Sequence, residues 1–467
     1  MFRNLTLILL ASTAVSACTL APDYKRPALP VSQTWSTPTP EPTSSVTAAD
    51  LDWRQVLVDT RLQGVVDLAL KQNRDLRVAV LNIERARGLY RIQRSELFPS
   101  IDATLSGSRG RTPASVSPVG VGGDTESYSA TIGFTAYELD LFGRIRSLNA
   151  SALQSYFATR ENSRAVRISL IAETANAWLS LAADQDRLAL AQGTLQTREE
   201  SLRLVQQQVD GGVGSLSDLR NAQILAETAR SDVATYTAQV AQDRNALVLL
   251  AGGDVPADLL PAGGLADARI LADLPAGLPS DVLVRRPDVL AAEHDLQGAN
   301  ANIGAARAAF FPRISLTGAF GSASGDLDGL FKGGTRTWSF APQISLPIFA
   351  GGANVANLAV SKADRDIAVA TYEKTVQTAF REVSDALSVR ATVADRVAAQ
   401  ERLVTAATDS QRLSQQRRDA GLDSALTLLD SQRTLYTAQQ GLITARLARA
   451  TNLVTLYKTL GGGAPAT

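Results

Sequence analysis

The chain has 467 residues and carries 46 basic and 46 acidic side chains, so its overall charge does not draw it to nucleic acid or to an acidic partner. It has one Cys and one His, which excludes a disulfide framework within the chain and argues against a Cys/His metal site. Aromatic residues make up only 5% of the chain, and the abundance of Ala, Leu, Gln and Arg suits long helices.

The first residues have the pattern of a secretory signal. A basic start at Arg3 precedes an apolar run over residues 5–15, which is too short to span a membrane. The sequence Val15-Ser-Ala-Cys18 resembles a bacterial lipobox and predicts a signal peptide over residues 1–17 with acylation of Cys18. By resemblance to bacterial lipoproteins, Thr19 favours a lipid anchor in the outer membrane, with the protein extending into the periplasm. The alternative is a chance Cys in an ordinary signal peptide.

The next segment is rich in Pro, Ser and Thr, as in Pro38-Thr-Pro-Glu-Pro-Thr-Ser-Ser45. Such a composition cannot bury a hydrophobic core, so residues 18–50 are expected to form a lipidated, extended tether that lets the folded body stand away from the lipid.

The rest of the chain is a tandem repeat. Asn73-Arg-Asp75 matches Arg286-Pro-Asp288, and Leu97-Phe-Pro-Ser-Ile101 matches Phe310-Phe-Pro-Arg-Ile314. A period of about 210 residues is too long for a solenoid unit and indicates duplication of half a protein. The expected boundaries are a first repeat over 51–250, a linker over 251–280, a second repeat over 281–463 and a tail over 464–467. Within the repeats we expect strand pairs at about 98–141 and 310–349, and helical hairpins over 144–250 and 352–460.

Each strand pair follows a Phe-Pro sequence. The predicted strands cover residues 100–109, 128–141, 313–320 and 338–349, with apolar and polar residues alternating most plainly in the second pair. Segments of about ten residues match the length of membrane-spanning β-strands. Four strands cannot close a barrel, and an open edge cannot lie in lipid. The strands therefore belong to a soluble sheet, or several chains complete one barrel.

Each helical hairpin carries a seven-residue repeat. The first hairpin has Leu181, Leu188, Leu195, Leu202 and Val209, then Leu219, Ala226, Val233, Val240 and Leu247; the second has Leu428, Leu435, Leu442, Arg449 and Leu456. Such a repeat keeps one seam of each helix on a partner helix. A helix from Arg144 to Val209 would be about 100 Å long, which is far longer than helices of globular domains.

These features together resemble the TolC/OprM-type outer-membrane factors, lipoprotein (NodT-type) branch, which are exit ducts of tripartite RND efflux systems. The motifs that carry the resemblance are the Phe-Pro strand starts, Leu346-Pro-Ile-Phe-Ala-Gly-Gly352, the segment from Ala420 to Arg433 and Leu456-Tyr-Lys-Thr-Leu-Gly-Gly-Gly463. The resemblance implies an α+β fold in which three chains build one twelve-stranded outer-membrane β-barrel continuous with a long periplasmic α-helical barrel. It also implies a periplasmic adaptor protein and an inner-membrane RND-type pump as partners, with passive export of small molecules such as drugs.

The resemblance further implies a periplasmic gate after the second hairpin tip. It identifies Leu426 and Asp430 as an apolar and an acidic ring, Arg433 as their interhelix partner, and Asp218 and Arg220 as the matching positions after the first tip. Leu426 equally fits core packing, Asp218 fits a helix N-terminal cap, and Asp430 and Arg433 fit an ordinary solvated helix face. The tip turns are the expected adaptor docking points: Gly211, Gly212, Gly214, Ser215, Gly421, Leu422, Asp423 and Ser424.

No catalytic constellation is present in the sequence, and no cofactor or metal is expected. His294 lies in a predicted helix, and the sequence nominates no nucleophile beside it. Two other functions are open: the outer-membrane duct of a type I protein secretion system, and a periplasmic coiled-coil scaffold lipoprotein. The scaffold leaves the four repeated strand segments unexplained.

Overall fold

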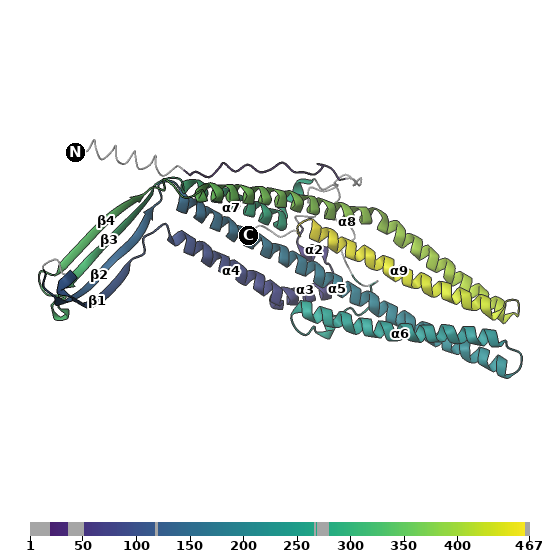
Figure 1. The fold of residues 1–467 in the computed structure, drawn as a ribbon. Helices are drawn as coiled ribbons and strands as arrows, with labels where there is room; N and C mark the ends of the chain where they lie inside the picture. The colour runs from purple at the N-terminus through teal and green to yellow at the C-terminus, as the bar shows by residue number, and fades with distance from the viewer. Residues whose placement is uncertain (1–18, 36–50, 117–119, 266–267, 269–279, 463–467) are drawn as a thin grey trace. The chain divides into compact units, whose positions relative to one another are not determined.

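The computed structural model describes residues 19–35, 51–116, 120–265, 268 and 280–462, which form two compact units (Figure 1). One unit contains residues 82–160 and 291–372 with the N-terminal segment, and the other contains residues 29–81, 161–290 and 373–467. The predicted acylation of Cys18 lies outside the described residues.

The first unit contains one antiparallel sheet of four strands in the order β1-β2-β3-β4. The strands are β1 (Asp102–Thr112), β2 (Gly123–Leu139), β3 (Arg313–Ser324) and β4 (Arg336–Ser345). The two strand pairs expected from the sequence are therefore joined through β2 and β3, one from each half of the repeat. In one chain, β1 and β4 are the edges of this sheet.

The strands differ from the predicted segments at their ends. β1 and β2 extend toward their hairpin loop, pairing as far as Thr112 with Gly123, because cross-strand pairing recruits Gly- and Thr-rich residues that do not show the alternation. β4 runs from Arg336 to Ser345, so it begins two residues earlier and ends four residues earlier than the predicted segment over 338–349.

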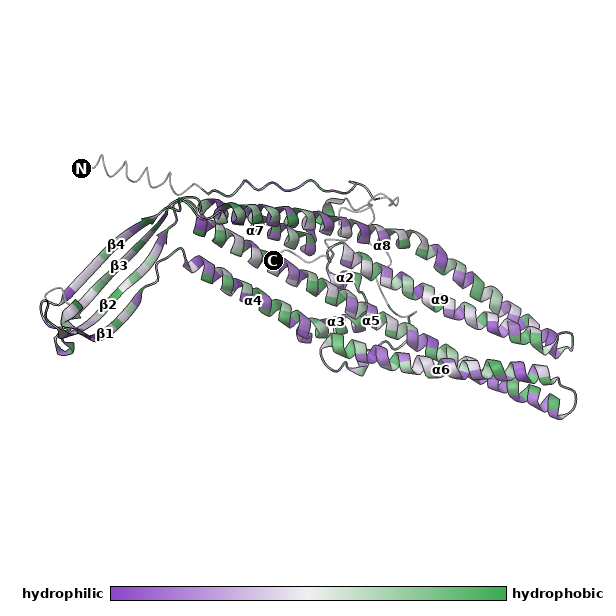
Figure 2. Cartoon of the chain, in the orientation of Figure 1, coloured by the Kyte–Doolittle hydropathy of each residue, from purple (hydrophilic) through white to green (hydrophobic). Residues whose placement is uncertain are grey.

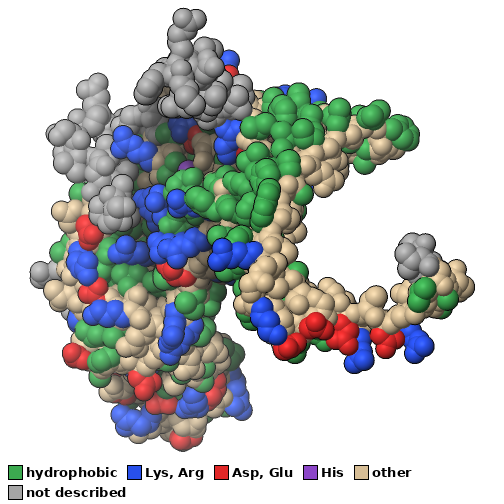
Figure 3. All heavy atoms as spheres, turned by 90° about the vertical axis from the view of Figure 1, so that its left-hand side faces the viewer, with side chains coloured by type: hydrophobic (Ala, Val, Ile, Leu, Met, Phe, Trp, Pro, Cys, Tyr) green, Lys and Arg blue, Asp and Glu red, His purple; other side chains and the backbone are tan. Residues whose placement is uncertain are grey.

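One face of the sheet is apolar and exposed. Ile132 pairs with Phe320 and Phe320 pairs with Trp338, so the three side chains share this face. Large exposed side chains on it are Leu105, Ile132, Phe320, Trp338, Phe340 and Ile344, all more than half exposed. The opposite face carries Thr, Ser and Gln, as the alternating hydropathy of the strands shows (Figure 2). Figure 3 views the protein from the sheet end and shows hydrophobic side chains gathered in patches on this surface.

A charged cluster fastens the end of the sheet to the following helix. Glu138 at the end of β2 accepts hydrogen bonds from Arg144 Nε at 2.8 Å and Nη2 at 2.9 Å, and from Arg313 at 3.0 Å. Gly143, with a φ of +75°, provides the left-handed residue at which the chain turns into α5 (Arg144–Asp210).

The helices follow the expected repeat. The first half contains α2 (Trp53–Val56), α3 (Thr60–Gln72), α4 (Arg74–Ser95), α5 and α6 (Leu216–Ala251); the second contains α7 (Pro287–Ala308), α8 (Ala353–Asp419) and α9 (Ala425–Thr459). Short 3-10 turns lie at Ala114–Val116, Ala257–Leu259, Ser280–Arg285 and Leu327–Gly329. The break predicted near Asn73 is confirmed: Asn73 ends α3, and its Oδ1 accepts from Leu76 N–H at 3.0 Å. Within the described residues, no helix is both long and apolar enough to cross a membrane.

The seven-residue repeat packs differently on different helices. On α6, four of the five predicted residues, Leu219, Ala226, Val240 and Leu247, are buried, and Val233 is half-buried. On α5 the most buried set is offset from the Leu set and consists of Asp184, Ala191, Arg198 and Val205. On α9 it consists of Ser431, Ala438, Ala445, Asn452 and Thr459. Small and polar residues therefore form these seams, because they let neighbouring helices approach closely while the Leu side chains flank them.

The N-terminal segment is extended but bound rather than free. Alternate residues face α7: Arg307 donates to Leu20 O at 2.9 Å, Asn300 to Pro22 O at 2.7 Å, and the carboxylate of Glu293 accepts from Tyr24 at 3.0 Å and from Arg26 at 2.8 and 2.7 Å. Further along, Trp35 stacks on Phe380. The sequence predicted a tether that stands away from the folded body, and this prediction is wrong for residues 19–35, which contact helices. In an extended chain every second residue points to the same side, so alternate residues can bond to α7.

Candidate functional site at the helical hairpin tips

The first tip is a glycine turn between α5 and α6. Gly212 has a φ of +76°, and the N–H groups of Val213 and Gly214 both donate to Gln208 O at 2.9 Å, which satisfies the last carbonyls of α5. A Cβ at Gly214 would lie 2.7 Å from Val209 N, so this position requires glycine. Ser215 caps α6 by accepting from Ser217 N–H at 3.1 Å.

The second tip has a similar turn and an added ion pair. Gly421 has a φ of +72°, and Leu422 N–H donates to Arg417 O at 2.8 Å. The Arg417 guanidinium forms two bonds of 2.9 Å with Asp423, and these bonds lower the pKa of the Asp423 carboxyl. Ser424 caps α9 through Thr427 N–H at 3.4 Å. The ion pair bridges the two sides of the second turn, and among the described residues the first turn has no such pair.

The residues predicted to form the gate lie on the exposed face of α9. Leu426 is 56% exposed, and the side chains of Asp430 and Arg433 are 59% and 67% exposed. Core packing, the alternative for Leu426, does not apply within one chain, because the buried residues of this turn are Leu428 and Leu429. Arg433 bonds Asp430 of its own helix at 2.5 Å, so within one chain it is not an interhelix partner.

The matching residues after the first tip lie on their own hairpin. Asp218 is in the first turn of α6, where its negative charge faces the positive end of the helix dipole. Arg220 donates to Gln223 Oε1 at 2.7 Å on the same helix. The contacts between described residues do not join either of them to Leu426 or Asp430.

A buried polar seam between the two hairpins is a feature that the sequence did not reveal. Tyr436 of α9 donates its hydroxyl proton to Asp232 of α6 at 2.8 Å, and one turn later Gln440 donates to the Tyr236 hydroxyl at 3.3 Å. Burial, followed by the hydrogen bond to Asp232, raises the pKa of Tyr436 well above its ordinary value, so the phenol stays a neutral donor. The seam therefore holds α9 against α6 within one turn of Arg433, the last of the gate residues.

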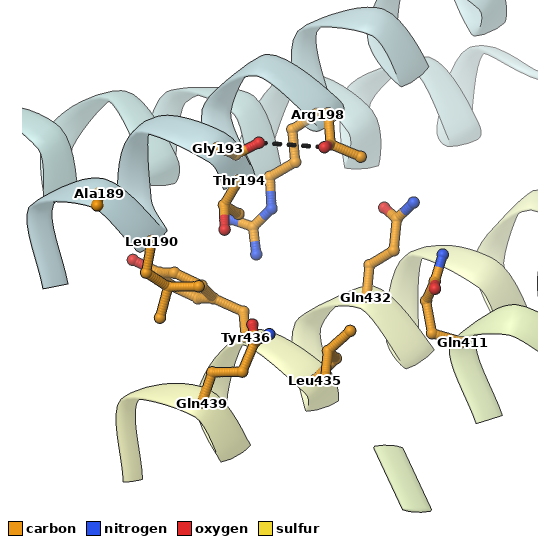
Figure 4. Close-up of a pocket in the computed structure, with 11 residues that line it drawn as sticks. Ala189, Leu190, Gly193, Thr194, Arg198, Gln411, Gln432, Leu435, Tyr436 and Gln439 are labelled. Carbon is orange, nitrogen blue, oxygen red and sulfur yellow. Dashed lines mark hydrogen bonds between the residues drawn. The ribbon is translucent and has the colours of Figure 1, made fainter. Parts of the chain in front are cut away.

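Arg198 supports this seam from α5. Its guanidinium lies 5.1 Å from the Tyr436 ring centre and donates to Leu225 O at 2.9 Å, while the side chain is only 3% exposed. Burial lowers the pKa of Arg198. Beside it a cavity of about 490 Å³ is lined by residues of α5, α8 and α9, with Arg198 reaching from α5 toward α9 (Figure 4). This part of the seam is thus polar and loosely filled.

One sequence signal pointed toward the seam. Asp184 and Arg198 occur at the same position of the seven-residue repeat, where they alternate with the apolar Ala191 and Val205. Charged residues in an apolar seam indicate a polar contact between helices. Their partners on α6 and α9 are distant in sequence and show no comparable pattern.

The single His lies on α7 and contacts α5. His294 Nδ1 lies 2.7 Å from Gln154 Oε1, and the His294 ring packs at a tilt against Phe157. His294 therefore joins α7 to α5. Among the residues that the structure describes, no group of three or more His, Cys, Asp and Glu side chains is placed to hold a metal ion.

Known proteins similar to this chain were found at the level of family, sequence and structure. The family model described as outer membrane efflux protein matches residues 65–253 and 278–462. The toluene efflux pump outer membrane protein TtgC and the antibiotic efflux pump outer membrane protein ArpC, both of Pseudomonas putida, are each 50% identical over 463 residues, 98% of this chain and 96% of the relative. The open-state crystal structure of the Neisseria gonorrhoeae MtrE outer membrane channel has a TM-score of 0.87 and 43% identity, covering 96% of this chain and 98% of that chain.

Proposed function

The chain belongs to the outer membrane efflux protein family, and we propose that it is the outer-membrane exit channel of a tripartite efflux pump, working as a homotrimer. The chain supplies no energy and no catalytic step. Substrates enter at the periplasmic hairpin tips, diffuse through the helical part and leave through the sheet region.

The observation that carries this proposal is the four-stranded sheet with an exposed apolar face and two open edges. An edge presents unpaired N–H and C=O groups, which cannot remain unpaired in lipid. Pairing β4 of one chain with β1 of the next removes every edge when three chains close a ring of twelve strands. The exposed apolar side chains then face lipid acyl chains.

The names of the relatives support small, largely apolar cargo. TtgC is named for toluene and ArpC for antibiotics, and both are close to this chain over nearly its full length. We therefore assign drugs and organic solvents as the substrate class. A wide duct selects little by itself, so the choice among these compounds belongs to the pump.

The tips provide the surface for a periplasmic adaptor protein, which links the channel to an inner-membrane RND-type pump. Val213 and Leu216 at the first tip and Leu422 at the second are 85%, 65% and 67% exposed. Three apolar side chains exposed at the two tip turns favour burial against a partner. The turn residues identified in the sequence, from Gly211 to Ser215 and from Gly421 to Ser424, shape this surface.

In this proposal the exposed face of α9 forms the gate. Three copies of Leu426 and of Asp430 make an apolar and an acidic ring around the threefold axis, and rings of this kind close pores and select ions. Adaptor binding opens the gate by favouring the open arrangement of the hairpins. Acylation of Cys18 is part of the proposal and anchors the chain to the outer membrane.

Deleting the gene is expected to make the host several-fold more sensitive to apolar antibiotics and solvents, because the pump then has no exit through the outer membrane. The minimal inhibitory concentration measures this effect. The full chain supplied on a plasmid should restore resistance, and an empty plasmid is the control. Loss of a secreted protein with unchanged drug sensitivity would instead identify the duct of a type I protein secretion system.

The protein purified from outer membranes is expected to have three times the mass of one chain, because only a closed ring satisfies the sheet edges. The detergent-corrected mass from light scattering measures this. A monomer would leave the four strands with open edges, contradict the channel and favour a periplasmic scaffold.

A further inference from the structure

A buried and a half-buried carboxyl group face each other across the first helical hairpin. Asp184 lies on α5 and is 6% exposed. It belongs to the most buried set of residues on that helix, together with Ala191, Arg198 and Val205. Asp243 lies on the antiparallel helix α6. Two contacts nearer the tip, Arg230 with Glu199 at 2.7 Å and Arg198 with Leu225 O at 2.9 Å, fix the register of the two helices. The same register places Asp243 opposite Asp184.

The hydrogen bonds around the pair leave one oxygen without a donor. Asp184 Oδ1 accepts from Arg187 at 2.5 Å, and Asp243 Oδ1 accepts from Gln239 at 3.1 Å. Asp243 Oδ2 is buried, and among the described residues no donor reaches it. Two ionised carboxylates offer only acceptors to each other, so a proton on one of them is the group that satisfies this contact.

We propose that Asp184 and Asp243 share one proton, and that this proton couples the pH of the periplasm to the contact between the first hairpin and α9. The coupling to α9 rests on the proposed channel function, whereas the shared proton does not. Nothing in the gate proposed above depends on either residue.

The electrostatic surroundings agree with a proton that is bound at mildly acidic pH. Burial, followed by the hydrogen bond to the facing Asp184, raises the pKa of Asp243 to about 6. The hydrogen bond from Gln239 and the positive charge of Arg187 act in the opposite direction and lower this pKa. Tyr236 of α6 faces the same region, and burial raises the pKa of its phenol, so Tyr236 remains neutral. From α9 the group that reaches the cluster is the neutral hydroxyl of Thr444.

Arg187 connects the pair to α9. Its Nη1 donates to Asp184, and its Nη2 donates to Thr444 Oγ1 of α9 at 3.1 Å. When Asp243 loses the proton, a second negative charge appears beside Arg187 and competes with the Thr444 hydroxyl for it. We therefore expect α9, which carries Asp430, to be held at acidic pH and released toward neutral pH.

The sign of the stability effect follows from the raised pKa. The folded protein keeps the proton on Asp243 at pH values where the unfolded chain has lost it. The stabilisation is therefore complete below the unfolded pKa of about 3.8 and is lost as the pH rises through about 6.

The first test compares the melting temperature of the purified protein between pH 4.5 and 8 in the wild type and in Asp243→Asn. The wild type is expected to lose stability across about pH 6 relative to Asp243→Asn, whose amide donates a hydrogen bond without titrating. Asp409→Asn, at an aspartate 61% exposed on α8, is the matched control and should follow the wild type. Parallel profiles for wild type and Asp243→Asn would overturn the shared proton. Asp184→Asn takes its place if Asp243→Asn does not fold.

The second test measures the conductance of the reconstituted protein over the same pH range. The wild type is expected to conduct more at neutral than at acidic pH, and Thr444→Val should remove this dependence while keeping the pH dependence of melting. If wild type and Thr444→Val have the same conductance profile, the coupling to α9 is wrong. If the wild type does not conduct at all, the proposed channel fails, and the melting comparison still decides the shared proton.

Discussion

Asp430→Ala is expected to raise the conductance of the reconstituted trimer by favouring its open state. Asp430 lies on the exposed face of α9 and pairs with Arg433, both side chains being more than half exposed. In the closed ring each Asp430 carboxylate is proposed to contact a neighbouring inner helix, an exposed ionic contact of this kind contributes roughly 0.5 kcal/mol, and threefold symmetry gives about 1.5 kcal/mol for the ring. About 1.4 kcal/mol changes an equilibrium tenfold, so the ratio of open to closed channels should rise by about that factor.

The measurement is single-channel recording in planar bilayers. Asp409→Ala is the control, because Asp409 is an equally exposed aspartate that pairs with Arg412 on its own helix, α8. Asp430→Asn removes the negative charge but keeps the shape of the side chain. If the conductance rises with Asn as well as with Ala, the negative charge of Asp430 holds the gate closed. Unchanged conductance in both variants would remove Asp430 from the gate.

Arg286→Met should cost about 3 kcal/mol of stability, the largest loss expected from a single side chain here. Arg286 is buried and donates to the carboxylates of Asp288 and Glu382 at 2.7 and 2.8 Å and to Thr459 O at 2.7 Å. It thus joins the start of α7 to α8 and to the last turn of α9. Met fills similar space but removes the guanidinium donor from two carboxylates and a carbonyl, and among the described residues only Asp288 keeps another donor, the Val289 N–H. Both carboxylates are more than a third exposed, which keeps the cost at the lower end of the range for broken buried pairs.

Thermal unfolding followed by circular dichroism measures this loss. Arg446→Met is the matched control, because Arg446 also links α9 to α8, through Glu401 at 2.9 Å, but both side chains are more than a third exposed. That change should cost less than about 1 kcal/mol. Equal melting temperatures for Arg286→Met and Arg446→Met would show that the buried network does not fix the end of α9.

The membrane-type strands and the hairpins were predictable because their signals are local. An alternation of period two and a repeat of seven residues each arise from the geometry of a single element. The glycine turns were readable for the same reason, since Gly212 and Gly421 adopt a backbone conformation that other residues avoid. Strand ends were less accurate, because the residues from Arg109 to Thr112 are held by β2 rather than by a pattern of their own.

The gate residues came from a resemblance to a family, and the physical pattern alone left Leu426 and Asp430 open to other interpretations. The structure narrows this choice for Leu426, whose exposure in one chain excludes packing in its own core. The role of Asp430 in the gate is a proposal, and the conductance of the Asp430 variants tests it.

The sequence by itself determined the duplicated plan, the strand pairs, the long hairpins and their turns, because each depends on residues close together along the chain. Only the tertiary structure decided which residues lie in the seams: the small and polar set on α9, the docking of residues 20–26 on α7, and the contact of Tyr436 with Asp232. The physical reason is that a helix offers several faces of similar hydropathy, and the choice among them depends on which groups of distant helices fit close together. The role of buried charged residues such as Asp184 and Arg198 depends on the groups of distant helices that they contact.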